Sequence, residues 1–294
     1  MNKDLLITGI KPTEAVNDMI IRTATPEDII QMIDWAAAEG WNPGLNDAHC
    51  YQLADPNGFF VGMIDDQMVA CISAVRYQGF GFIGFYMVKP EYRGRGLGMH
   101  IWYHAMEYLS GCQIGLDGVV AQRKNYEKSG FRMAHKSIRY AWQHQSIADA
   151  VAMKPPADHN EDTLLSYLDD FFPASRHAFN SAWRSQDNAK EFLVSEAGKI
   201  KGYGVIRACL EGYKIGPLFA SDLATAQCIL EQLTIELTDG CQVFLDVPKV
   251  NKKAVQLVTQ MGAEPVFETV RMYIGGAPRI HVYNTYGITS FEIG

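Results

Sequence analysis

The chain of 294 residues is longer than one typical domain of about 100–200 residues, so two domains are expected. Its composition, 48% apolar and 20% charged, is ordinary for a globular protein that buries a core. The net charge of −7 comes from interspersed acidic and basic residues, without the basic stripe that marks nucleic-acid-binding proteins. Such a surface keeps a protein soluble and is also compatible with a cationic small molecule as ligand.

The six cysteines form no C-x-x-C pair and no metal-ligand spacing, so no metal site is expected. Residues 1–10 lack the apolar segment of a signal peptide, and no apolar run approaches the roughly 20 residues that cross a membrane. We therefore expect a cytoplasmic protein that contacts neither membrane nor nucleic acid.

The first part of the chain alternates between helix and strand patterns. Thr25 and Asp28 form a capping box around Pro26, which predicts a helix up to Gly40 and a second, short helix up to about residue 53. Apolar, β-branched and aromatic runs predict the next strands. The expected strands are 59–64, 68–77, 80–88, 112–121 and 131–142, with helices from 96 and over 122–129.

Residues 143–160 are polar and contain Pro155-Pro156, which is typical of a linker. The order of elements then partly repeats, so the second half reads as a diverged copy of the first. Its expected helices are 161–171, 221–237 and 251–261, and its expected strands are 191–194, 200–210, 212–219, 242–247 and 266–273.

A glycine-rich loop joins the third expected strand to a helix. Free backbone N–H groups and the positive end of the dipole make a helix N-terminus a site for anions. Gly94, Gly96 and Gly98 allow the backbone to approach a pyrophosphate closely, and Arg93 and Arg95 can add charge-assisted contacts. The spacing departs from the G-x-G-x-x-G of a dinucleotide fold, and the Gly-Lys-Ser/Thr of a P-loop is absent. A glycine-rich structural turn would leave the two arginines unexplained.

The run Val88-x-Pro90-x-x-Arg93-Gly94-x-Gly96-x-Gly98 resembles the acetyl-CoA loop of the GNAT (GCN5-related) N-acetyltransferase superfamily. Tyr126-x-x-x-Gly130-Phe131 resembles the second signature of that superfamily, and the intervening order of elements matches as well. The resemblance implies a mixed α/β sheet in which two parallel strands splay apart around the pantetheine arm of acetyl-CoA, the co-substrate. It places the backbone of Tyr86, Met87 and Val88 along the pantetheine. It also places the pyrophosphate on Arg93, Gly94, Arg95, Gly96, Leu97, Gly98 and Met99.

The superfamily transfers an acyl group by direct attack of an amine on the thioester, which needs a base, an oxyanion donor and an acid for the leaving thiolate. The N–H of Val88 or Met87 could serve the oxyanion, and Tyr126 matches the general acid. Tyr126 could instead be a core aromatic with a satisfied hydroxyl. Asp117, or a water reached through Tyr86, is the candidate base. The usual asparagine before the tyrosine is missing, and Gln122 or Asn125 is a candidate to replace its contact with CoA.

In the second half, Asn251-x-x-Ala254-x-x-Leu257 resembles the same second motif, but 216–222 lacks the glycine pattern and carries Asp222, which would repel pyrophosphate. The layout resembles a YitH-like tandem group with an active first and a degenerate second domain. It implies a catalytic domain at 1–145, a linker at 146–160 and a degenerate domain at 161–294. Glu268, Arg271 and Asp246 either line the acceptor pocket or form structural ion pairs, and we favour the ion pairs.

The expected function is therefore transfer of an acetyl group from acetyl-CoA to a primary amine of a small molecule or peptide. A catalytically lapsed acyl-CoA-binding regulatory protein is the alternative, and a dinucleotide-dependent oxidoreductase ranks third. The acceptor is not identified by the sequence, which also leaves a homodimer open.

Overall fold

Twelve strands form one continuous mixed sheet in the computed structural model, which describes residues 18–146, 151–153 and 160–294. The strand order is β1-β2-β3-β4-β5-β11-β6-β10-β9-β8-β7, and β12 pairs with β9. The expected mixed α/β fold with two similar halves is confirmed, and both halves share the one sheet.

In the part of the chain that the structure describes, the first half supplies six strands and four α-helices. The strands are β1 (Ile20–Thr23), β2 (Phe59–Ile64), β3 (Gln67–Arg76), β4 (Phe80–Val88), β5 (Gln113–Val119) and β6 (Arg132–Gln143). The helices are α2 (Pro26–Ala38), α3 (Asp47–Ala54), α4 (Leu97–Tyr108) and α5 (Arg123–Lys128), with short 3-10 turns at Pro90–Tyr92 and Val120–Gln122.

The second half repeats this arrangement. Its strands are β7 (Ala189–Glu196), β8 (Lys199–Ala208), β9 (Tyr213–Ala220), β10 (Gln242–Pro248), β11 (Glu264–Ile274) and β12 (Thr285–Gly287). Its helices are α6 (Glu161–Asp169), α7 (His177–Ser185), α8 (Leu223–Thr234) and α9 (Lys252–Gln260), and a 3-10 turn at Val282–Asn284 precedes β12.

The two halves exchange strands at the middle of the sheet. β11, from the end of the second half, lies between β5 and β6 and pairs antiparallel with both. β6, from the end of the first half, pairs with β10 of the second half. Each half therefore completes the sheet of the other.

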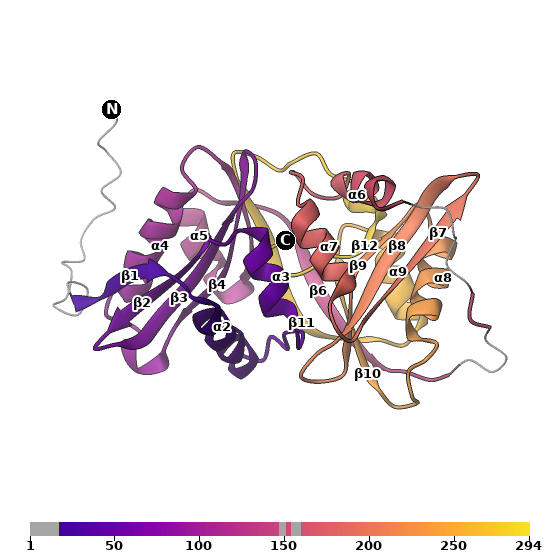
Figure 1. The fold of residues 1–294 in the computed structure, drawn as a ribbon, viewed down its shortest axis with the longest axis horizontal. Coiled ribbons are helices and arrows are strands. Elements are labelled where there is room, and N and C mark those ends of the chain that lie inside the picture. The colour runs from indigo at the N-terminus through magenta and orange to yellow at the C-terminus, as the bar shows by residue number, and fades with distance from the viewer. Residues whose placement is uncertain (1–17, 147–150, 154–159) are drawn as a thin grey trace.

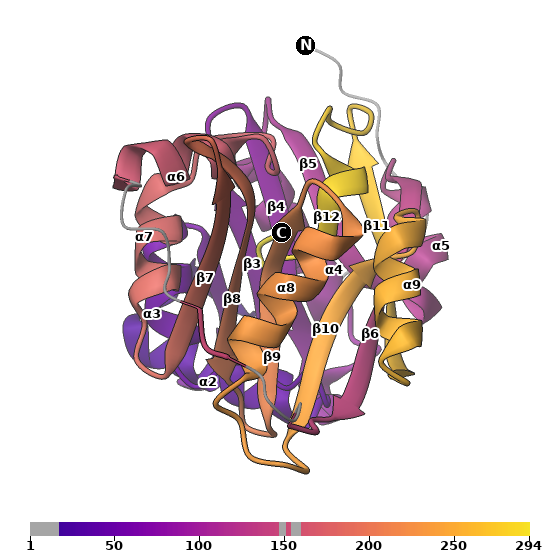
Figure 2. The same ribbon diagram turned by 90° about the vertical axis from the view of Figure 1, so that its right-hand side faces the viewer.

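Apart from α2, which packs beside α3, the helices lie in three groups around this sheet (Figure 1). α4 and α5 cover the outer side of the first half, and α8 and α9 cover the outer side of the second half, facing the viewer in Figure 2. α3, α6 and α7 lie between the halves, and the C-terminus ends among them (Figure 1).

Three apolar clusters follow this layout. One lies under α4 and α5 and another under α8 and α9. The third combines Phe82 and Phe85 of β4 with Phe179 and Trp183 of α7 and with Tyr203 of β8. Because this central cluster draws on both halves, their apolar surfaces are buried against each other.

Several local signals determine the ends of elements as predicted. Thr25 and Asp28 form the expected reciprocal capping box on α2, with Pro26 in its first turn. Asn251 caps α9 by accepting the backbone N–H groups of Lys253 and Ala254. By contrast, α7 and β12 were not predicted, because their short polar and apolar runs carry no distinctive period.

The predictions for residues 1–10 and for most of the linker at 146–160 lie outside the described residues. Among the helices that the structure describes, none has the length and apolar character needed to span a bilayer.

Candidate functional site

Strands β4 and β5 separate where the resemblance places the pantetheine. They pair in parallel from Phe80 and Gln113 as far as Ile83 and Leu116, and the pairing ends there. A bulge in β4 coincides with this point, since its partners on β3 jump from Ser73 opposite Gly84 to Cys71 opposite Met87. Phe85, inside the bulge, has a φ of 45°. The bulge re-aims the remainder of β4 and so opens the sheet.

The opening leads to a cavity of about 370 Å³. Tyr86, Met87, Val88, Arg93, Asp117 and Tyr126 of the first half line it, together with Phe267, Thr269, Phe291 and Glu292 of the second half. A larger hollow of about 690 Å³ lies against α8 and α9 and contains none of the residues of the first-half motifs. The smaller cavity is therefore the candidate site.

The glycine-rich loop lies beside this cavity and opens α4. Gly94 and Gly96 have φ values of 78° and 86°, in the left-handed region that favours glycine. Gly96 is the N-cap of α4 and provides no side-chain acceptor, so the first N–H groups of the helix stay available to an anion. A Cβ on Gly98 would lie 2.8 Å from the Tyr86 hydroxyl, which explains the third glycine by close packing of helix against strand.

The two loop arginines are held differently. Arg93 donates to the carbonyl of Val88 at 2.8 Å and forms an ion pair with Glu39 at 2.6 Å, both at the cavity wall. Arg95 donates to the carbonyl of Glu91 and lies over the ring of Tyr92. A guanidinium at the wall of an anion site can exchange a surface carboxylate for a phosphate.

Tyr126 lies on α5 with its ring against β5. A Cβ on Gly118 would come within 2.2 Å of this ring, so the ring position requires glycine on the strand. Trp102 packs on the other side at 5.8 Å between ring centroids. Burial, with a smaller contribution from Tyr86, raises the pKa of the Tyr126 hydroxyl. That hydroxyl has no hydrogen-bond partner among the described residues. It is a neutral donor on a residue that lines the cavity.

Asp117, the candidate base, lines the cavity with both oxygens engaged. Its Oδ1 and Oδ2 accept from Nε and Nη2 of Arg271 at 2.9 Å and 2.5 Å. Burial raises the pKa of Asp117, and Arg271 opposes that shift. Asp246 likewise binds Arg139, and Glu268 pairs with Lys136. Asp246, Glu268 and Arg271 therefore form structural ion pairs.

Three further predicted CoA contacts have differing environments. Asn125 is exposed and donates to Gln122, which itself lines the cavity. Leu97 is fully buried in the core under α4. Met99 is 44% exposed on the same helix.

The equivalent opening in the second half is filled by the chain itself. β9 and β10 also pair in parallel only as far as Ile215 and Leu245, with a bulge at Gly216-Pro217. β12 then pairs with β9 opposite Leu218 and Phe219, and the N–H of Ile288 donates to the carbonyl of Asp246 on β10. Residues 285–288 thus occupy the space between the two strands.

The N-terminus of α8, the counterpart of the glycine-rich loop, is also occupied. Asp222 is its N-cap and accepts from the N–H of Thr225 at 2.9 Å. A carboxylate at this position already satisfies the helix N–H groups and repels phosphate.

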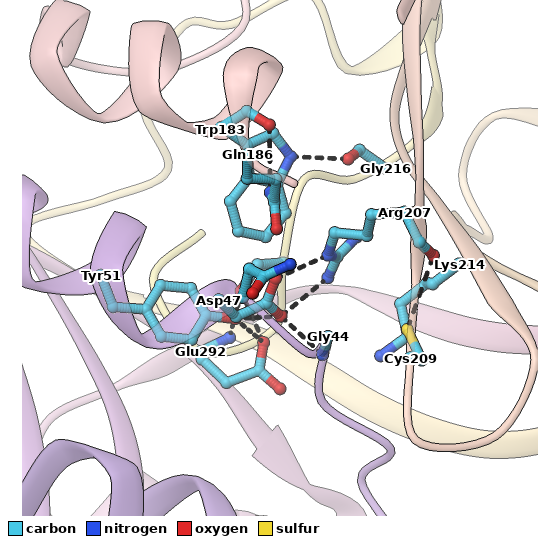
Figure 3. Close-up of polar contacts among 12 residues, drawn as sticks. Gly44, Asp47, Tyr51, Trp183, Gln186, Arg207, Cys209, Lys214, Gly216 and Glu292 are labelled. Atoms are coloured by element: carbon cyan, nitrogen blue, oxygen red, sulfur yellow. Dashed lines mark hydrogen bonds and ion pairs between the residues drawn. The ribbon is translucent and has the colours of Figure 1, made fainter. Parts of the chain in front are cut away.

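A buried polar cluster joins the halves (Figure 3). Arg207 of β8 donates to both oxygens of Asp47 on α3, at 2.8 Å and 3.2 Å, and stacks on Trp183. Tyr51 and the N–H of Gly44 donate to Asp47 as well. Sequence reasoning missed this cluster, although an arginine inside the apolar run 205–209 was a signal for it.

Gly84 lies where the C-terminal tail crosses β4, and its substitution is expected to displace the tail. A Cβ at Gly84 would lie 2.0 Å from the carbonyl oxygen of Glu292. Gly84→Ala should therefore lower the free energy of unfolding by about 1–3 kcal/mol, as overpacking does. In Gly81→Ala, on the same strand, the new Cβ meets only the side-chain ends of Leu109, so chemical denaturation should show a smaller loss. Equal stability of the Gly84 variant and wild type would contradict the close approach.

Comparison with known proteins agrees with both halves of the fold. Residues 27–131 match the model of the Acetyltransferase (GNAT) family, and residues 165–287 match that of an Acetyltransferase (GNAT) domain. Holothin acyltransferase of Pseudoalteromonas sp. (strain SANK 73390) is 30% identical over 263 residues, which cover 89% of this chain and 90% of that protein.

Solved structures share the tandem fold. One is the crystal structure of a protein from Pyrococcus horikoshii that is described as an acetyltransferase. Its TM-score is 0.79 at 24% identity, and the match covers 94% of this chain and 96% of that one. A tandem GNAT protein from the clavulanic acid biosynthesis pathway has a TM-score of 0.59 at 14% identity, covering 88% and 99%. With the two sequence matches and the acyltransferase relative, the chain belongs to the GNAT acetyltransferase superfamily as a tandem acyltransferase.

Proposed function

We propose that the chain transfers an acetyl group from acetyl-CoA to a primary amine of a small molecule or peptide. The observation that carries this proposal is the open end between β4 and β5, which connects the glycine-rich loop to the hydroxyl of Tyr126 through one cavity. An anion site binds the pyrophosphate of CoA, and a proton donor supplies the acid that the leaving thiolate needs.

In this proposal the backbone of Tyr86, Met87 and Val88 binds the pantetheine amides as an added strand. The N–H groups of residues 93–99 and the Arg93 guanidinium bind the pyrophosphate. The N–H of Val88 or Met87 stabilises the oxyanion, and Tyr126 protonates the departing sulfur. Residues 1–145 hold this machinery, while residues 161–294 complete the acceptor side and bind no CoA.

The acceptor remains to be found by experiment. An acetyl-transfer screen against amino acids, polyamines, aminosugars and peptide N-termini should reveal at least one acetylated amine. Holothin is included in the screen because the name of the similar acyltransferase contains it. Binding of acetyl-CoA without acetylation of any amine would favour a regulatory acyl-CoA-binding protein instead.

Acetyl-CoA is expected to raise the melting temperature, since a ligand that binds only the folded state stabilises it by about 2.7 kcal/mol at 100 times its Kd. Gly96→Val should abolish this ligand-induced shift, because valine is strained at a φ of 86° and its side chain covers the first N–H groups of α4. The measurement is thermal unfolding with and without acetyl-CoA.

Asp222→Ala is the matched control, since it changes the corresponding helix start in the second half. Its free energy of unfolding should fall by about 1 kcal/mol because α8 loses its N-cap. Acetyl-CoA should still raise its melting temperature by the full amount. A shift that survives Gly96→Val, or disappears in Asp222→Ala, would move the CoA site out of the first half.

A further inference from the structure

The C-terminal tail, residues 288–294, leaves the second half and forms part of the wall of the first-half cavity. It is buried throughout and firmly held. Arg176 donates to the carbonyl of Gly294 at 2.5 Å and to the hydroxyl of Thr289 at 2.9 Å. Tyr77 donates to the carbonyl of Ile293, and the backbone of Glu292 rests against Gly84. The tail therefore has one fixed position at the open end of β4.

Glu292 brings a carboxylate to this wall. The residue is 4% exposed, and its Oε2 accepts from the hydroxyl of Ser290 at 2.5 Å. It also lies 3.2 Å from the hydroxyl of Tyr51, whose one proton it shares with Asp47. Its Oε1 accepts no hydrogen bond from any residue that the structure describes, and Figure 3 shows this oxygen pointing away from Tyr51. Two hydroxyls thus orient the carboxylate and leave one oxygen available.

Glu292 differs from the other buried carboxylates where the two halves meet. Asp47, Asp117 and Asp246 each bind an arginine through both oxygens. Within residues 18–146 and 160–294, no lysine, arginine or histidine nitrogen lies within 4.0 Å of Glu292. Arg139 and Lys214 act on Glu292 only from beyond ion-pair distance. Since a buried charge without a contacting counter-ion is costly, a cationic ligand would find a favourable partner here.

We propose that Glu292 binds the ammonium group of the acceptor and accepts its proton, which rests on the proposed function of the same site. Charged and titratable groups surround Glu292 on five elements. They are Asp47 and Tyr51 on α3, Asp117 on β5, Arg139 on β6, its partner Asp246 on β10, and Lys214 on β9. The acids and arginines pair with one another, and Lys214 donates to the carbonyls of Trp41 and Asn42. Glu292 is the carboxylate left for the acceptor.

The surrounding wall indicates the rest of the acceptor. Trp41, Phe267 and Phe291 line the same cavity, and the Arg139 guanidinium lies 5.1 Å from the ring centroid of Phe291 and 5.8 Å from that of Phe267. An apolar or aromatic body beside an ammonium group fits this lining. The acceptor class is therefore a small primary amine with an apolar body.

The reaction balances with these groups. Glu292 takes one proton from the ammonium, and the amine nitrogen attacks the thioester carbonyl to form the C–N bond. The C–S bond then breaks, Tyr126 protonates the sulfur, and the nitrogen returns a proton to Tyr126. The products are the amide and the free CoA thiol, and Glu292 releases its proton to solvent.

Glu292→Gln tests this role because it keeps an acceptor for Tyr51 and Ser290 but removes the charge. The assay is release of the CoA thiol from acetyl-CoA with benzylamine as probe. At neutral pH the variant should lose about 10²-fold or more in kcat/KM. The loss should shrink near about pH 10, where a large fraction of an alkylamine is unprotonated. Acetyl-CoA should stabilise the variant as it does wild type.

Two further variants complete the test. Glu292→Asp keeps the charge and should retain part of the activity at neutral pH, which also covers the case in which Glu292→Gln fails to fold. Glu236→Gln removes a surface carboxylate, 74% exposed on the second half, and should behave as wild type.

The outcomes separate the two proposals. Three results would overturn the role of Glu292 while wild type still transfers the acetyl group, which leaves the proposed function intact. The first is a Glu292→Gln variant with wild-type kcat/KM, and the second is one whose loss of kcat/KM is equal at all pH values. The third is a Glu292→Asp variant that folds but is inactive. Acetyl-CoA binding with neither transfer to benzylamine nor stabilisation by it overturns the acceptor class. Absence of both acetyl-CoA binding and transfer in wild type overturns the proposed function itself.

Discussion

Asp47→Ala is expected to lower the free energy of unfolding by about 3–5 kcal/mol, because it leaves a buried arginine without its counter-ion. Asp47 and Arg207 are each about 1% exposed and are joined by two hydrogen bonds. Burial alone would lower the pKa of Arg207, but Asp47 more than offsets it, so the arginine stays charged. Nη1 of Arg207 has no partner among the described residues even in wild type.

The effect should extend to the whole molecule because the pair joins α3 of the first half to β8 of the second. Chemical denaturation followed by fluorescence should show a lower midpoint for the entire transition. Glu127→Ala breaks an exposed ion pair with Arg123 and should change stability by well under 1 kcal/mol. A cost for Asp47→Ala no greater than that of Glu127→Ala would show that the buried pair does not hold the halves together.

Tyr126→Phe is expected to lower kcat by about 10²–10⁴-fold, the range that general acid catalysis contributes. The raised pKa of this hydroxyl keeps it protonated at neutral pH, as an acid must be. Phenylalanine keeps the ring that packs against Gly118 and Trp102, so the cavity should keep its shape and acetyl-CoA affinity should be unchanged. Steady-state kinetics and calorimetry on one preparation separate the two effects.

Tyr103→Phe provides the matched control. Tyr103 lies on α4 and is 55% exposed, outside the cavity wall. Its loss should leave both kcat and affinity at wild-type values. If Tyr126→Phe retains full turnover, the proton for the departing thiolate comes from another group.

The glycine-rich loop and Tyr126 could be predicted because their signals are local. Gly96 needs a left-handed backbone and Gly98 a close approach to Tyr86, and both demands act within about a dozen residues of the chain. The capping box at Thr25 is equally local.

The groups that sequence reasoning missed come together only through the long-range topology. Asp47 and Arg207 are 160 positions apart, and Tyr51 and Glu292 are 241 apart. Asp117 was a reasonable base by position on its strand, but β11 brings Arg271 beside it, which no local pattern foretells. The exchange of β6 and β11 brings Arg271 to Asp117, and the packing of α3 and of the chain after β12 between the halves makes the other contacts.

The filled second opening also explains why two similar halves should have different functions. A strand of the chain pairs with β9 where β4 is left free. As far as the described residues show, the first half alone therefore combines an open β4 edge with a glycine-rich helix start, and Tyr126 lines the same cavity.

Titration calorimetry with acetyl-CoA tests this central claim most directly. The account predicts one molecule bound per chain in wild type and none in Gly96→Val. Two molecules per chain, or one that Gly96→Val still binds, would contradict a single site between β4 and β5.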